Sequence, residues 1–124
     1  PWSPLAGGLL TGKYQRNTTP PEDSRFANVA NNPHLQRRMV DAIFDVVEGL
    51  QPLADAKGIT LAQFALAWTM HQPGITSPII GPRTMEQLQG NLHALNIKLS
   101  AEDLARLDEI WPGPGGPAPE AYAW

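Results

Sequence analysis

The chain has 124 residues, of which 42 % are hydrophobic, and its formal net charge is −3. This length fits one ordinary domain, and the negative charge argues against a sequence-independent nucleic-acid binder, which needs a net positive field. Because cysteine is absent, disulfides and thiolate metal sites are excluded. No apolar run approaches the ~18 residues of a membrane span, and no signal-peptide pattern occurs. We therefore expect a soluble, cytoplasmic protein that binds neither nucleic acid nor membrane.

The N-terminal part of the chain predicts a strand end followed by a long loop. Residues 1–12 combine Gly, Pro and Ser with Leu, and their prolines exclude a long strand. We interpret them as the end of a strand that enters a turn. Residues 13–32 are polar and contain a Pro-Pro pair, which predicts a loop. Loops longer than ~12–15 residues are uncommon in compact domains and are often functional.

Helices are predicted within residues 33–72. Asn32 can accept a backbone N–H bond as a helix cap, and Pro33 fits the first helical position. Apolar residues then recur at helical spacing as far as Leu53, and Pro52 is expected to kink or split this helix. Thr60 begins a capping box with a glutamine three residues later, which predicts a second helix.

The C-terminal part predicts one buried strand and further helices. Residues 76–81 form a short apolar run bounded by Pro and Gly, as in a parallel strand. Thr84 and Ser100 cap helices within 84–111, and the tail 112–124 is irregular. Strand, helices and strand in this order form a βαβ unit. Two parallel strands are too few for a stable sheet, so we expect an α/β chain that is part of something larger.

Two motifs closely resemble the aldo-keto reductase family. They are WSPLAGGLLTGKY near the start and PIIGPRTMEQLQGN farther on, and the C-terminal LSAEDLARLDEIWPGPGGPAPEAYAW resembles the end of that family. The resemblance implies the C-terminal portion of a (β/α)8 TIM barrel, with its last two strands and their helices, incomplete as a barrel on its own. Residues 1–12 would hold the end of strand seven, 13–32 the cofactor loop and 76–81 strand eight. A complete barrel needs roughly 250 residues.

The resemblance also implies a site for NADP(H). The aromatic residue at the Trp2 position would stack on the nicotinamide ring, and Ser3 and Leu5 would line the pyrophosphate. A flat apolar face suits a flat ring, and a hydroxyl with backbone N–H groups suits an anion. The residues expected to bind cofactor are Trp2, Ser3, Pro4, Leu5, Lys13, Arg25, Gly81, Arg83, Gln87 and Asn91. The plainer alternatives are a proline-rich turn around a buried Trp2 and ordinary solvated charges at Lys13 and Arg25.

Residues 81–84 lead from the predicted strand into a helix whose N-terminus favours a phosphate. Arg83 adds a bidentate fork, which the resemblance assigns to the 2′-phosphate of NADPH. Gln87 and Asn91 share one helical face and match family positions that contact adenine. Gln87 can also cap the helix, and both roles are compatible only if its side chain turns outward. Gly90 stands where some relatives carry an acidic residue, which leaves one cofactor contact in doubt.

The sequence offers no catalytic residue and no metal site. In the family a Tyr donates the proton, with Asp, Lys and His on earlier strands that this chain does not contain. We therefore expect part of an NADPH-dependent reductase of aldehydes or ketones that is inactive alone. Its partners would be a small carbonyl substrate and the N-terminal part of the barrel or copies of itself. The alternatives are a non-catalytic nucleotide-binding or self-associating fragment, and an unrelated helical domain.

Overall fold

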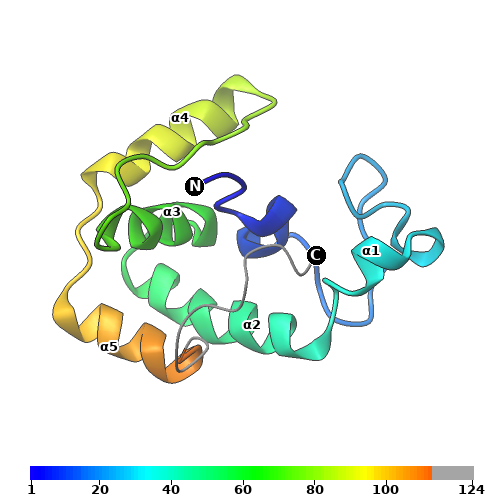
Figure 1. The fold of residues 1–124 in the computed structure, drawn as a ribbon, viewed down its shortest axis with the longest axis horizontal. Coiled ribbons are helices and arrows are strands. Elements are labelled where there is room, and N and C mark those ends of the chain that lie inside the picture. The colour runs from blue at the N-terminus through cyan, green and yellow to red at the C-terminus, as the bar shows by residue number, and fades with distance from the viewer. Residues whose placement is uncertain (113–124) are drawn as a thin grey trace.

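Helices dominate the described part of the chain, residues 1–112 of the computed structural model (Figure 1). The predicted tail lies, from residue 113 onward, outside the described residues. The α-helices are α1 (Pro33–Gln36), α2 (Asp41–Ala56), α3 (Leu61–His71), α4 (Met85–His93) and α5 (Ala101–Ile110). Short 3-10 turns are formed by Ala6–Thr11, Val29–Asn31 and Ala94–Asn96. In Figure 1, α3 lies between α4 above and α2 and α5 below.

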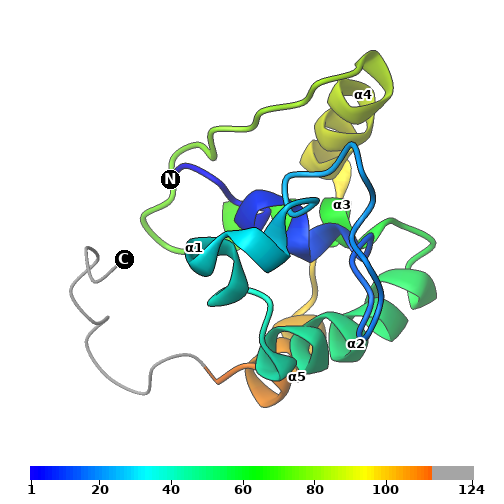
Figure 2. The same cartoon turned by 90° about the vertical axis from the view of Figure 1, so that its right-hand side faces the viewer.

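The predicted strand at 76–81 is not formed as a strand, and the described residues contain a single parallel bridge, between Trp2 and Ile79. In this bridge the backbone N–H of Ile79 donates to the carbonyl of Pro1 at 2.7 Å. The positive φ of Ser3, 57°, turns the chain out of the extended conformation directly after the bridge, so the pairing does not continue as a ladder. The two segments nevertheless lie side by side in the predicted parallel direction (Figure 2).

The core lies where α2 packs against α3 and α5. Phe64 and Ala67 of α3 and Ala54 of α2 are fully buried there. Gly49 allows α2 and α5 to approach closely, since a Cβ at this position would lie 3.1 Å from Ile110 Cγ2. A second cluster joins the N-terminal turn, the loop and α2, and its buried members are Leu9, Tyr14, Phe26 and Phe44. The apolar spacing of these helices therefore produces two small cores.

The first helical segment is interrupted at a different place from the one predicted. The expected break at Pro52 does not occur, because α2 continues through it to its end. Pro52 is exposed, so the carbonyl that loses its intrahelical partner can bind water. The helix that begins after Asn32 instead ends at Gln36, and α2 starts after the extended residue Val40. The Asn32 cap itself is confirmed, with its side chain accepting from the N–H of His34 at 3.0 Å.

Side-chain caps fix the starts of α3 and α5, as predicted. Thr60 and Gln63 form a reciprocal capping box, and Ser100 and Asp103 form another. Asp103 also pairs with Lys57 Nζ at 2.7 Å, which ties α5 to the end of α2. Burial alone would raise the pKa of Asp103, but hydrogen bonds from Lys57 and Ser100 outweigh it and lower the pKa below its ordinary value.

We expect Asp103→Asn to lower the free energy of unfolding by about 1 kcal/mol near neutral pH, because the ion pair is lost while one capping oxygen remains. A carboxylate with a lowered pKa stabilises the fold above its unfolded pKa of ~3.9 and loses this effect as pH falls through the folded pKa. The difference from the unmutated chain should therefore shrink in strong acid. Urea unfolding at pH 7 and pH 3 measures it, with the exposed Asp108→Asn as control. If the difference in unfolding free energy is as large at pH 3 as at pH 7, the ion-pair explanation is contradicted.

Candidate functional site

The turn that follows Trp2 has an unusual backbone. Ser3 and Ala6 have positive φ angles of 57° and 50°, which are uncommon for residues with a side chain. Gly7 and Gly8 continue the left-handed backbone with φ angles of 71° and 102°. The N–H groups of Ala6 and Gly8 donate to the carbonyls of Ser3 and Leu5 within the turn, and concave backbone turns of this kind suit an anion. Strained residues of this kind cluster at ligand sites, so the turn is the first element of a candidate binding site.

Two cations of the loop cover this glycine pair. A Cβ added to Gly7 would lie 3.3 Å from Arg25 Cδ, and one added to Gly8 would lie 3.0 Å from Lys13 Cε and 3.1 Å from its Nζ. The structure therefore brings Lys13 and Arg25 together over the turn, although they lie twelve residues apart in the sequence. Any side chain in place of either glycine would displace one of the two cations.

The N-terminus of α4 forms the second element of the site. The Thr84 hydroxyl accepts from the N–H of Gln87 at 3.2 Å, and Gln87 Oε1 accepts from the N–H of Arg83 at 2.7 Å. Gln87 is therefore turned back to cap the helix, and the outward orientation that an adenine contact would require is not adopted. Arg83 Nη2 donates to the carbonyl of Asp23 at 3.1 Å, so its side chain reaches across to the loop.

The remaining expected positions lie close to these two elements. Gly81 is exposed just before Arg83, and Asn91 is half-buried one turn after Gln87. At Gly90 an added Cβ would meet only the Gln63 amide, at 3.9 Å, so the position has room for a side chain. Glycine inside a helix costs roughly 1 kcal/mol relative to alanine.

A second anchor of the loop was not expected from the sequence. Arg16 pairs with three carboxylates of α2: Asp41 at 2.7 Å, Asp45 at 2.6 Å and Glu48 at 3.3 Å. Its guanidinium also lies 5.5 Å from the centre of the Phe44 ring. The hydrogen bonds that Arg16 donates to Glu48 and Asp45 raise the pKa of Arg16 above its ordinary value, so it stays charged. The signal in the sequence was the i, i+4, i+7 spacing of the acids, which share one helical face.

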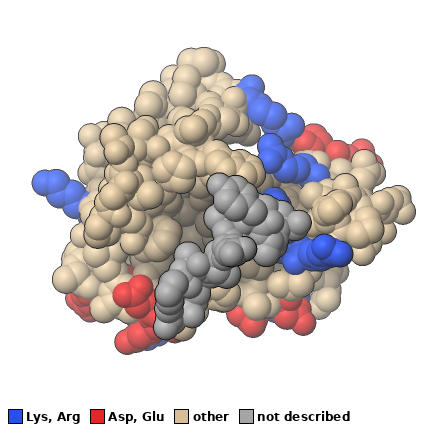
Figure 3. Space-filling model, in the orientation of Figure 1, with Lys and Arg blue, Asp and Glu red and all other residues tan. Residues whose placement is uncertain are grey.

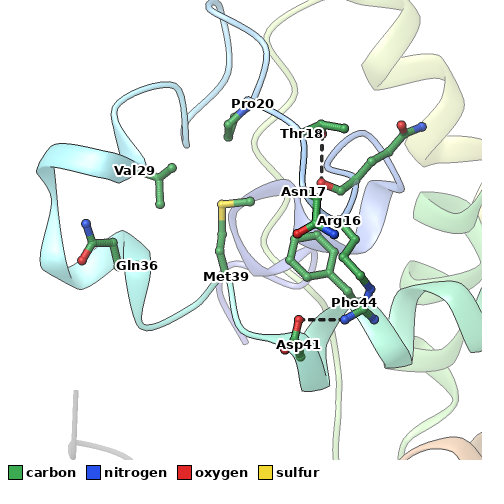
Figure 4. Close-up of a pocket in the computed structure, with 10 residues that line it drawn as sticks. Arg16, Asn17, Thr18, Pro20, Val29, Gln36, Met39, Asp41 and Phe44 are labelled. Atoms are coloured by element: carbon green, nitrogen blue, oxygen red, sulfur yellow. Dashed lines mark hydrogen bonds and ion pairs between the residues drawn. The ribbon is translucent and has the colours of Figure 1, made fainter.

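Arg16 also lines a pocket of about 300 Å³ between the loop and the start of α2 (Figure 4). A larger hollow of about 490 Å³ lies beside Trp2 and Ser3, with Arg37 and Arg38 on its wall. The sequence analysis missed these two arginines, whose only signal is adjacency in an acidic chain. Figure 3 shows acidic side chains mainly along the lower edge of the molecule, where α2 and α5 run.

The two halves of the candidate site are held near each other by the bridge at Ile79. This hydrogen bond places the start of the Trp2 turn beside the segment that leads to Arg83. Within residues 1–112 no group of acidic and histidine side chains could hold a metal ion. No helix in that range has the length and apolar content to cross a bilayer. The site consists of N–H groups, cations and an aromatic ring, which together suit a phosphorylated aromatic ligand.

Comparison with known protein families gives this arrangement a context. The model of the aldo/keto reductase family matches residues 1–112. The chain belongs to the aldo/keto reductase family. The family fold is a TIM barrel, of which the described residues show mainly the helices and one strand contact. The resemblance noted from the two sequence motifs is therefore confirmed at the level of the family.

Several curated relatives are similar over most of the chain. The uncharacterized oxidoreductase YrpG of Bacillus subtilis is 42 % identical over 99 % of this chain and 35 % of its own length. A probable voltage-gated potassium channel subunit beta of Arabidopsis thaliana is 45 % identical over 77 % of this chain and 29 % of its own. An L-glyceraldehyde 3-phosphate reductase of Escherichia coli O157:H7 is 36 % identical over 87 % and 32 %. The chain thus spans about a third of the length of these aldo/keto reductase relatives.

We expect Arg16→Gln to loosen the loop, because the three acids of α2 would then repel one another with no cation between them. Backbone amide hydrogen exchange in residues 13–20 should become several-fold faster, while exchange in α3 stays unchanged. Arg106→Gln, which removes an exposed cation paired with Glu109 on α5, is the matched control. Equal exchange in the loop of both variants would show that the Arg16 cluster does not hold it.

Proposed function

We propose that this chain supplies the cofactor-binding part of an NADPH-dependent aldo/keto reductase that reduces aldehydes or ketones by hydride transfer. The observation that carries the proposal is the hydrogen bond from Ile79 to Pro1. It holds the turn after Trp2 beside the segment leading to Arg83, so that one dinucleotide could contact both. NADPH would supply the hydride, and the residues of this chain would bind and orient it.

The residues present fit a dinucleotide phosphate. The left-handed turn needs glycine at Gly7 and Gly8, and the missing side chains there leave room for an anion close to the backbone. Lys13 and Arg25 lie over the same pair and add positive charge. In the proposed arrangement the pyrophosphate lies at this turn, and the nicotinamide ring lies on the indole of Trp2, which is 66 % exposed.

The other end of the cofactor would lie at the start of α4. The positive end of the helix dipole favours the 2′-phosphate there, while the N–H groups of Arg83 and Gln87 are already engaged by side-chain caps. Arg83 has five N–H donors and uses only one for the Asp23 carbonyl, so it can bind a phosphate and the loop together. This contact would close the loop across the cofactor. Gln87 would reach adenine only after giving up its contact with the N–H of Arg83.

The partner that this proposal requires is the rest of the barrel. Trp2, Ile79, Met85 and Leu95 are large apolar side chains that are 65–67 % exposed in the described structure. Exposed large apolar side chains are typical of protein–protein contacts, and the relatives are about three times as long as this chain. A second copy of the chain is the alternative partner, and measuring the size of the protein in solution separates the two.

We expect Arg83→Ala to weaken NADPH binding by about tenfold to a hundredfold, because hydrogen bonds to a charged phosphate contribute about 1.5–3 kcal/mol. Binding of NADH, which lacks the 2′-phosphate, should barely change. Fluorescence titration of the full-length protein with both nucleotides measures this, with Arg106→Ala as control. Equal losses for the two nucleotides, or none, would exclude Arg83 as the 2′-phosphate ligand.

We also expect the full-length protein to oxidise NADPH with a generic aldehyde and this chain alone to remain inactive. Carbonyl reduction needs an acid within hydrogen-bond reach of the developing alkoxide, and no residue of this chain is assigned that role. The assay follows NADPH absorbance with and without aldehyde. Turnover by the chain alone would contradict the division of roles proposed here.

A further inference from the structure

Two shielded hydroxyl groups in the loop have no hydrogen-bond partner among the described residues. They are the phenol of Tyr14, a residue only 3 % exposed, and the hydroxyl of Ser24. Folded proteins satisfy the large majority of buried hydroxyls, because an unsatisfied one costs about 1–3 kcal/mol. Two such groups within one loop therefore require an explanation.

Both hydroxyls belong to residues beside the cations that cover the glycine turn. Tyr14 Cε2 lies 3.6 Å from the place a Cβ would take on Gly8, and Lys13 Nζ lies 5.0 Å from the centre of the same ring. Ser24 directly precedes Arg25, whose Cδ lies at the corresponding place on Gly7. Each unsatisfied group is thus linked to one half of the proposed phosphate site.

The groups around Tyr14 limit which hydrogen-bond acceptors its hydroxyl can reach. Its ring meets Phe26 edge to face, with centroids 5.0 Å apart, and the side chains of the other buried members of this cluster are apolar and cannot accept a hydrogen bond. The carboxylates that α2 directs toward the loop are engaged by Arg16. With Lys13 against the ring, the acceptor that best fits is an anion held at the same turn.

We propose that the hydroxyls of Tyr14 and Ser24 are further donors to the pyrophosphate of the bound dinucleotide, directly or through one water molecule. This inference rests on the proposed function and deepens it. The loop would exchange an unfavourable state of both hydroxyls for charge-assisted hydrogen bonds when the cofactor binds. Part of the binding free energy would then come from giving hydrogen-bond partners to two hydroxyls that lack them in the protein without nucleotide.

The proposal predicts opposite effects on stability and affinity. Removing an unsatisfied buried hydroxyl is neutral or stabilising, so Tyr14→Phe should unfold at the same or a higher urea concentration without nucleotide. The same variant should bind NADPH about tenfold more weakly, and Ser24→Ala should behave likewise. Both should weaken NADH to the same degree, since the two nucleotides share the pyrophosphate. Thr19→Ala, an exposed hydroxyl of the same loop, is the control and should change neither property.

The experiment is urea unfolding without nucleotide and fluorescence titration with NADPH and NADH, on the full-length protein. Unchanged affinity of Tyr14→Phe, or a loss of stability without nucleotide, would overturn the inference, because the hydroxyl would then be idle or already satisfied within the protein. If the unmutated protein binds NADPH and only the variant result fails, the proposed function survives. Absence of binding by the unmutated protein would remove both.

Discussion

One backbone hydrogen bond, from Ile79 to Pro1, determines how the candidate site is assembled. It belongs to the parallel bridge that pairs the N-terminal turn with the segment leading to α4. The two flanking segments carry the strained glycine turn on one side and the start of a capped helix on the other. One short contact therefore places the glycine turn and the start of α4, two backbone features of a kind that suits an anion, next to each other.

The loop of residues 13–32 is then fixed at several points. Arg16 attaches its beginning to α2 through three carboxylates, and Arg83, just before α4, donates to the carbonyl of Asp23 farther along. On either side of these two points, Tyr14 and Phe26 pack edge to face in the second core. The loop is long and polar in sequence, yet these attachments give its cations defined positions over the turn.

Local sequence signals predicted the helices well because their causes are local. A threonine or serine followed three residues later by a partner side chain fixes a helix start within one turn, as at Thr60 and Ser100. The strand at 76–81 could not be established this way, because a strand depends on neighbours distant in sequence. Pro52 shows that a local signal can also predict a break that the helix does not have. Its effect on α2 depended on solvent exposure, which the residue alone does not reveal.

The candidate site was predictable as a pair of motifs, but its detailed contacts were not. The placement of Lys13 and Arg25 over the glycine turn follows from motif residues, and their proximity is visible only in three dimensions. The inward turn of Gln87 reflects competition between two uses of one amide, which sequence reasoning could state but not decide. Arg16 was missed because its partners lie more than twenty residues away.

Because the Arg16 cluster is exposed, the ionic strength of the solution affects how strongly it holds the loop. Its three acidic partners are 58–87 % exposed, so dissolved salt screens these pairs over a Debye length of about 8 Å at physiological ionic strength. The aromatic contact between Tyr14 and Phe26 is buried and scarcely feels the salt. The loop therefore has one attachment that weakens in concentrated salt and one that persists.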